Sequence, residues 1–157
     1  NSRNVTYRLN LDGWVAYEGG RGGQTSSYVQ LFRNGTLEAV HAPEEDTGQR
    51  STVHTDYEAK LSKALPDYVK TLAELEIEPP FLLCLSLANV NGWYLDGGAF
   101  KTSDFAFDTG IVTAPSVMVS EPGFDTDRAL LELFNVIWQA GGVEKSPRDK
   151  GGKIEPI

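Results

Sequence analysis

The two histidines of the chain are the first residues to weigh for chemistry. His41 and His54 bracket a polar stretch, and acidic side chains surround them: Glu44, Glu45, Asp46, Asp56 and Glu58. Imidazole and carboxylate groups together suit divalent cations or acid-base catalysis. The spacing fits no recognised ligand motif, however, so solvated positions at the end of a strand and beside a helix start explain both histidines better. We assign no catalytic residue and no metal ligand.

A second candidate is the glycine-rich segment 19–23, in which Arg21 is the charged side chain. A phosphate-binding loop requires a Gly-Lys-Ser/Thr ending or a strand-turn-helix context, and the segment has neither. A strand-like stretch follows, so a flexible hairpin connection is the preferred interpretation. The alternative is a binding lid that uses Arg21. The corresponding enzyme hypothesis is a small enzyme or ligand-binding domain with its site between the loop 19–23 and the segment 41–56. No cofactor is assigned.

Aromatic side chains give a third kind of candidate. Trp14, Trp93 and Tyr94 have the character of residues that stack unpaired bases on a sheet face, and arginines would add phosphate contacts. The arginines concerned are Arg8, Arg33 and Arg50. No basic excess surrounds them, so packing in the core or in a dimer is the preferred interpretation. An aromatic interface patch is another use of the same residues. We therefore name as candidate ligand or partner contacts Arg21, Arg33, His41, His54, Trp93 and Tyr94.

The composition limits the classes of function. The 157 residues carry a formal net charge of -8, which opposes broad contact with nucleic acid, so nucleic acid is expected as an indirect partner only. The single cysteine, Cys84, lies in an apolar run and is expected to be buried. It cannot form an intrachain disulfide, and no apolar run is long enough to cross a bilayer. We expect a cytoplasmic protein with no membrane contact.

The elements that would position these residues begin with two hairpins. The segments 5–11 and 14–17 flank Asp12-Gly13, and 28–32 and 37–40 flank Asn34-Gly35, for which we predict a type I′ turn. Thr55 or Asp56 should cap a helix over about 56–76, which Pro66 kinks or splits. The apolar run 81–87 resembles a central, doubly covered strand.

The rest of the chain alternates between strands and one further helix. Pro115 interrupts the strand-like segment 111–119, and Asp125 and Asp127 should cap a mostly buried helix that ends at Gly141-Gly142. Within it Trp138 is expected to be a core residue. The chain is thus predicted to be α+β, with a mainly antiparallel sheet that begins with β-hairpins and with two principal helices packed on it. We expect one domain over 1–143 and a flexible C-terminal tail over 144–157.

Three segments taken together resemble a known family. They are 27–40 (SYVQLFRNGTLEAV), 78–93 (EPPFLLCLSLANVNGW) and 130–142 (LLELFNVIWQAGG). Their order resembles the C-terminal region of bacterial Schlafen-type, AlbA-like DNA-binding proteins, which are described as transcriptional regulators or ATP-binding proteins. The resemblance implies a partner domain, N-terminal and AlbA-like, on the same polypeptide, and it transfers no catalytic residue.

Taken with the resemblance, the sequence predicts a non-catalytic regulatory or assembly domain of a nucleic-acid-associated bacterial protein, and it leaves a homo-oligomer open. The absence of an initiator Met favours a domain cut from a longer chain.

Overall fold

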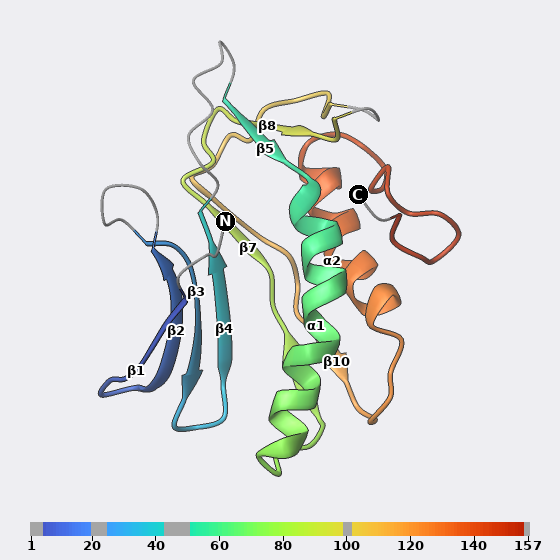
Figure 1. The fold of residues 1–157 in the computed structure, drawn as a ribbon. Coiled ribbons are helices and arrows are strands. Elements are labelled where there is room, and N and C mark those ends of the chain that lie inside the picture. The colour runs from blue at the N-terminus through green and yellow to red at the C-terminus, as the bar shows by residue number, and fades with distance from the viewer. Residues whose placement is uncertain (1–4, 20–24, 43–50, 99–101, 156–157) are drawn as a thin grey trace. The chain divides into compact units, whose positions relative to one another are not determined.

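The computed structural model describes residues 5–19, 25–42, 51–98 and 102–155. Within them the chain is α+β, with an antiparallel four-stranded sheet and two long helices, as the sequence predicts (Figure 1). It divides into two compact units, Asn1–Thr47 and Gly48–Ile157, where the sequence analysis expects one domain. We describe each unit by itself.

The first unit is a meander of four strands. They are β1 (Val5–Leu9), β2 (Gly13–Gly19), β3 (Thr25–Phe32) and β4 (Leu37–His41), paired in chain order. Both predicted hairpins are therefore confirmed. At the first turn the Asn10 side chain accepts hydrogen bonds from the backbone N–H groups of Asp12 (3.0 Å) and Gly13 (2.8 Å). A side chain in place of the Gly13 hydrogen would sit 2.1 Å from the Leu31 carbonyl oxygen, so this position requires glycine.

The second turn differs from the predicted type I′. A type I′ turn needs positive φ at both central residues, but of Asn34 and Gly35 only Gly35 has one, at 85°. The Gly35 N–H donates to the Phe32 carbonyl (3.0 Å), and the Phe32 N–H donates to Thr36 (2.8 Å). This is the pattern of a three-residue loop that ends in a left-handed glycine.

The second unit is built around two helices that contact each other. Helix α1 (Asp56–Glu74) has Thr55 at its N-cap position, one of the two residues predicted there, but the Thr55 hydroxyl makes no capping hydrogen bond and donates to the Asp96 carbonyl instead. The helix runs through Pro66, so the prediction that Pro66 splits it is wrong.

Helix α2 (Thr126–Ala140) begins at Asp125, whose carboxylate accepts a hydrogen bond from the Arg128 N–H (3.1 Å). Seven of the fifteen residues of α2 are buried, fewer than in the mostly buried helix of the prediction, and Trp138 is among them as expected.

Short strands complete the second unit as three separate pairs. β5 (Thr52–His54) pairs in parallel with β8 (Tyr94–Asp96). β6 (Phe81–Leu83) pairs with β10 (Val117–Val119), and β7 (Ser86–Ala88) pairs with β9 (Ile111–Thr113), both antiparallel. β9 and β10 contact α2.

The prediction of one central strand over 81–87 is wrong. The run breaks at Cys84 and Leu85, so that β6 and β7 each pair with only one neighbour. Alternate residues of the run are exposed, Cys84 among them, so the prediction of a buried thiol is also wrong. The physical reason is that each two-stranded ribbon turns one side to the core and the other to solvent.

The C-terminal segment also differs from the expected loose tail. Ser146, Arg148 and Ile154 are buried, and the Ser146 hydroxyl donates to the Glu58 carboxylate of α1 at 2.5 Å. The other carboxylate oxygen of Glu58 accepts from the indole N–H of Trp138 at 2.7 Å. The described part of the C-terminal segment, which ends at residue 155, is thus hydrogen-bonded to α1 through Ser146. Glu58 is fully buried, and this burial raises the pKa of its carboxyl, although the hydrogen bonds and Arg148 lower it in part.

Candidate interaction surface

The four-stranded sheet has two chemically different faces. In an antiparallel pair, residues that face each other across the ladder point to the same side. The register of β1–β4 therefore sorts the side chains of the sheet into two sets. One set, which we call the apolar face, has a polar row at one end and is otherwise apolar. The polar row is Glu18, Ser27 and His41, and the apolar members are Val5, Tyr7, Leu9, Trp14, Ala16, Val29, Leu31, Leu37 and Ala39.

The opposite face carries most of the polar side chains of the sheet, and several of these have partners. The Arg8 guanidinium lies 5.6 Å from the centre of the Tyr17 ring. The Tyr28 hydroxyl donates to Glu38 at 2.9 Å, which raises the pKa of the Tyr28 phenol. The buried Gln30 side chain accepts a hydrogen bond from the Asn10 amide (2.8 Å). Several polar side chains of this face are thus paired within the sheet and its turns.

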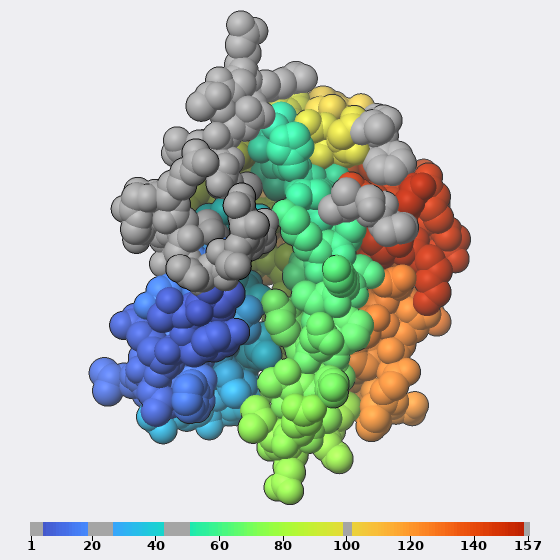
Figure 2. Space-filling model, viewed as in Figure 1, coloured from blue at the N-terminus to red at the C-terminus, as the bar shows by residue number. Residues whose placement is uncertain are grey.

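The apolar face lies open over β1 and β2. Tyr7 is 70% exposed, Leu9 60% and Trp14 55%, and all five residues of β1 are exposed. Side chains of these strands form the blue surface in Figure 2. On the β3 and β4 side of the same face, Val29, Leu31 and Leu37 are partly buried and Ala39 is small and exposed. Contiguous exposed apolar surface of this kind marks interaction sites in soluble proteins.

The sequence-predicted contact residues do not gather with this face. Arg33 belongs to the second turn, and its Nε donates to the Leu11 carbonyl at 3.1 Å. His41 lies at the end of β4, in the same row as Ser27 and Glu18, at the rim of the apolar face. Arg21 lies outside the described residues, as does much of the proposed enzyme site, which draws on 19–23 and 41–56.

The remaining candidates belong to the second unit. His54 and Tyr94 lie on the paired strands β5 and β8, and His54 Nδ1 is 3.6 Å from Asp96 Oδ2. Trp93 is partly buried against the core around α2. Of Trp14, Trp93 and Tyr94, the three aromatic residues considered for stacking, Trp14 is the exposed one. Arg8 points away from it, on the opposite face of the sheet, so the described arginines do not form a phosphate track beside Trp14.

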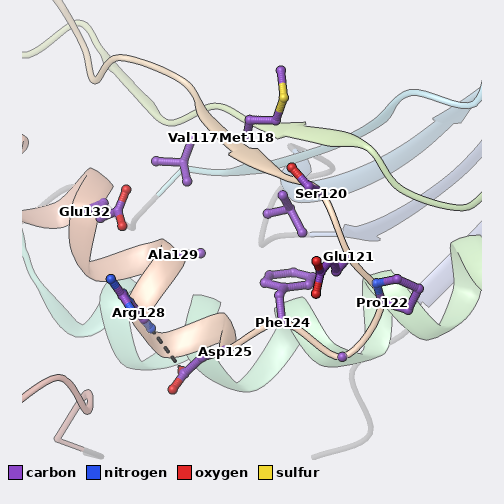
Figure 3. Close-up of a pocket in the computed structure, with 12 residues that line it drawn as sticks. Val117, Met118, Ser120, Glu121, Pro122, Phe124, Asp125, Arg128, Ala129 and Glu132 are labelled. Atoms are coloured by element: carbon purple, nitrogen blue, oxygen red, sulfur yellow. Dashed lines mark hydrogen bonds between the residues drawn. The ribbon is translucent and has the colours of Figure 1, made fainter.

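A hollow at the start of α2 is another candidate for a functional site. It measures about 360 Å³ and is lined by the segment between β10 and α2 and by Arg128 and Glu132 of α2 (Figure 3). Its lining includes neither histidine nor cysteine. The Asp125 carboxylate already caps α2 and contacts Lys153 Nζ at 3.0 Å, which together lower its pKa. The Asp125 carboxylate is thus already engaged, and Glu121, Arg128 and Glu132 are the other charged side chains of the lining.

Two further structural findings bear on the site. Among the described residues, no group of three or more His, Cys, Asp or Glu side chains is arranged to hold a metal ion. Within the same part of the chain, no helix has the length and apolar character needed to cross a membrane.

The apolar face was only partly visible from the sequence. The sequence offers Trp14 as an interface residue only as an alternative to packing in the core or in a dimer, and Tyr7 and Leu9 are not among the candidate residues. The signal was the alternation of Val5, Tyr7 and Leu9, which places them on one side of a strand. In comparisons with known proteins, no protein-family model matches the chain, and no curated protein or solved structure matches it significantly.

Proposed function

We propose that the chain is a non-catalytic assembly domain that associates through the apolar face of β1–β4. The observation that carries the proposal is the exposure of Tyr7, Leu9 and Trp14 side by side on one face. A sheet normally buries its apolar face against another layer. Here the β1 and β2 half of that face is open, whereas several polar groups of the opposite face are paired within the sheet.

The wider context of the proposal comes from the sequence. The resemblance to Schlafen-type, AlbA-like proteins favours an accessory domain of a nucleic-acid-associated bacterial protein, in which an N-terminal AlbA-like domain meets the nucleic acid. The net charge of -8 supports an indirect role, because the chain itself repels a polyanion. The surface that we assign to assembly is apolar, which agrees with a role in binding protein while the N-terminal domain binds nucleic acid.

Site-specific photo-crosslinking in the native cells tests the proposal. A photoreactive phenylalanine analogue replaces Tyr7 in one variant and Leu75 in a control. Leu75 is a 50% exposed residue at the end of α1, in the other unit. We expect discrete crosslinked species from position 7 and none from position 75. Equal yields from the two positions, or no adduct from position 7, would refute the assembly role of this face.

A further inference from the structure

We infer that the apolar face of β1–β4 binds the same face of a second copy of this chain, with the twofold axis along the strands. The inference rests on the proposed function, because it names the partner of the surface proposed above. Its basis is the shape, the charge and the size of the face.

The two halves of the apolar face differ in the size of their exposed side chains. On β1 and β2, Tyr7 and Trp14 are large and more than half exposed. On β4, their row partners are smaller or less exposed: Ala39 lies in the row of Tyr7, and the partly buried Leu37 lies in the row of Trp14. A face with large side chains on one side and smaller ones on the other complements a copy of itself that is turned over.

A twofold axis along the strands brings the two halves together. It places β1 over β4 of the second copy and β2 over β3. Tyr7 then faces Ala39, and Trp14 faces Leu31. Sheets that pack face to face in this way lie about 10 Å apart, with strand directions within about 30° of each other. An axis across the strands would instead stack Tyr7 on Tyr7, large side chain on large side chain, so the first arrangement fits better.

The charges of the face agree with a copy of the same chain. Apart from the row of Glu18, Ser27 and His41 at one end, the described residues of this face carry no ionisable acid or base, Tyr7 excepted. In the twofold arrangement, Glu18 faces Ser27 of the second copy, so like charges do not meet. The net charge of -8 opposes association only at long range. Salt screens such repulsion, and the dimer should therefore tighten as salt is added.

The size of the face predicts a modest affinity. Four strands spaced about 4.8 Å apart, with five residues at about 3.4 Å each, give a face of roughly 300 Å² in plan. Side-chain relief raises the accessible area, since a Tyr or Trp buries about 150–250 Å². Two faces would then bury on the order of 1,000 Å², near the lower limit for a specific interface. A dissociation constant in the micromolar range is expected.

Sedimentation equilibrium of the purified chain over low to high micromolar concentrations tests the inference. We expect a monomer–dimer equilibrium that tightens with salt. Leu9→Lys should weaken the dimer at least about tenfold, which corresponds to about 1.4 kcal/mol. The matched control Leu75→Lys changes an equally apolar, 50% exposed leucine outside the face and should leave the constant unchanged. A chain that stays monomeric throughout, or a dimer weakened equally by both variants, would overturn the inference.

A shape exchange tests the register of the dimer. Ala39→Trp should abolish association, because the Tyr7 ring of the second copy occupies that space. Adding Tyr7→Ala in the same chain should restore it, since the large and small positions are then swapped. Glu38→Trp, on the opposite face, is the control and should have no effect. Circular dichroism checks that each variant folds. Failure of the double variant to restore association would exclude this register.

The two proposals fail separately. If position 7 crosslinks to a different protein in cells while the purified chain remains a monomer, the face is an assembly surface but its partner is not a second copy. If position 7 yields no adduct and the chain is monomeric, both proposals are wrong. Association that weakens with added salt would indicate a charged partner or contact elsewhere, and would contradict the apolar dimer.

Discussion

The apolar face of β1–β4 and the apolar side of α2 use the same residue types and differ in what covers them. On α2, Leu133, Phe134, Ile137 and Trp138 are 2% exposed or less. On the sheet, Tyr7 and Trp14 stand more than half exposed. Each region has a tryptophan, but only that of α2 has its indole N–H bonded to a buried carboxylate. An apolar surface that folding leaves open is available for binding, whereas one that folding covers determines stability.

The largest expected effect is that of removing the buried tryptophan. Trp138→Ala opens a cavity and leaves the Glu58 carboxylate without one of its donors, so we expect a loss of about 3–5 kcal/mol in the free energy of unfolding. Trp14→Ala is the matched change on the open face and should cost less than about 0.5 kcal/mol. Thermal and denaturant melts of the monomer measure both. Similar losses for the two variants would remove the distinction between the regions.

A substitution at Gly13 should lower the stability of the first unit and leave that of the second unchanged. Gly13 has a φ of 149°, and an added Cβ would meet the Leu31 backbone. We expect Gly13→Ala to destabilise β1–β4 by about 1–3 kcal/mol, through backbone strain, and to leave the core around α2 intact. Hydrogen exchange reports the protection of each unit. Gly110→Ala, where an added Cβ meets nothing within 4 Å, is the control. Equal loss of protection in both units would show that they unfold together.

The buried carboxylate gives the covered region a pH dependence that the open face lacks. Burial raises the pKa of Glu58 in the folded state, so the folded chain binds more protons than the unfolded chain between the ordinary carboxyl pKa and the raised value. This contribution to stability is full below that interval and is lost as the pH rises through it. The slope is at most about 1.4 kcal/mol per pH unit for one proton.

Glu58→Gln tests this contribution while keeping the side-chain size. The unfolding free energy of the wild type minus that of the variant should fall as the pH rises through the interval. The amide oxygen can still accept from Trp138, and the amide nitrogen can donate to Ser146. Denaturant melts across the acidic and neutral range measure the difference. A difference that is flat or rises with pH would show that the pKa of Glu58 is not raised.

Much of the fold followed from local patterns. The hairpins came from alternation and turn residues, the start of α1 came from Thr55, and the burial of Trp138 came from the spacing of apolar residues. These signals lie within a few residues, where local chemistry decides the conformation. The turn at Asn34-Gly35 was located correctly but its type was not, because the loop length depends on the pairing of Phe32 with Thr36.

Long-range partners could not be predicted in this way. Glu58 was weighed as an acid-base candidate near His54, yet it lies on the buried side of α1, seven residues before Leu65 and fourteen before Leu72. The spacing of Glu58 from these leucines could have predicted that it is buried. Nothing in the sequence predicts that Ser146 is its partner, because Ser146 is 88 residues away in a segment without periodicity. The break at Cys84 likewise depends on two different partner strands.

The smallest expected effect on folding comes from the open face itself. Leu9→Lys places a charged side chain on an exposed edge strand, where lysine is well tolerated, and should change the unfolding free energy of the monomer by less than about 0.5 kcal/mol. Leu75→Lys should be equally silent, since a cation at the end of α1 also suits the helix dipole. Denaturant melts at a concentration below the dimer range measure both. If Leu9→Lys alone lowers the stability of the monomer, then Leu9 is a packing residue of the folded chain and the face is not free for a partner. If neither variant changes the unfolding free energy of the monomer, the apolar side chain of Leu9 does not contribute to folding. Its exposure is then explained by association with a partner.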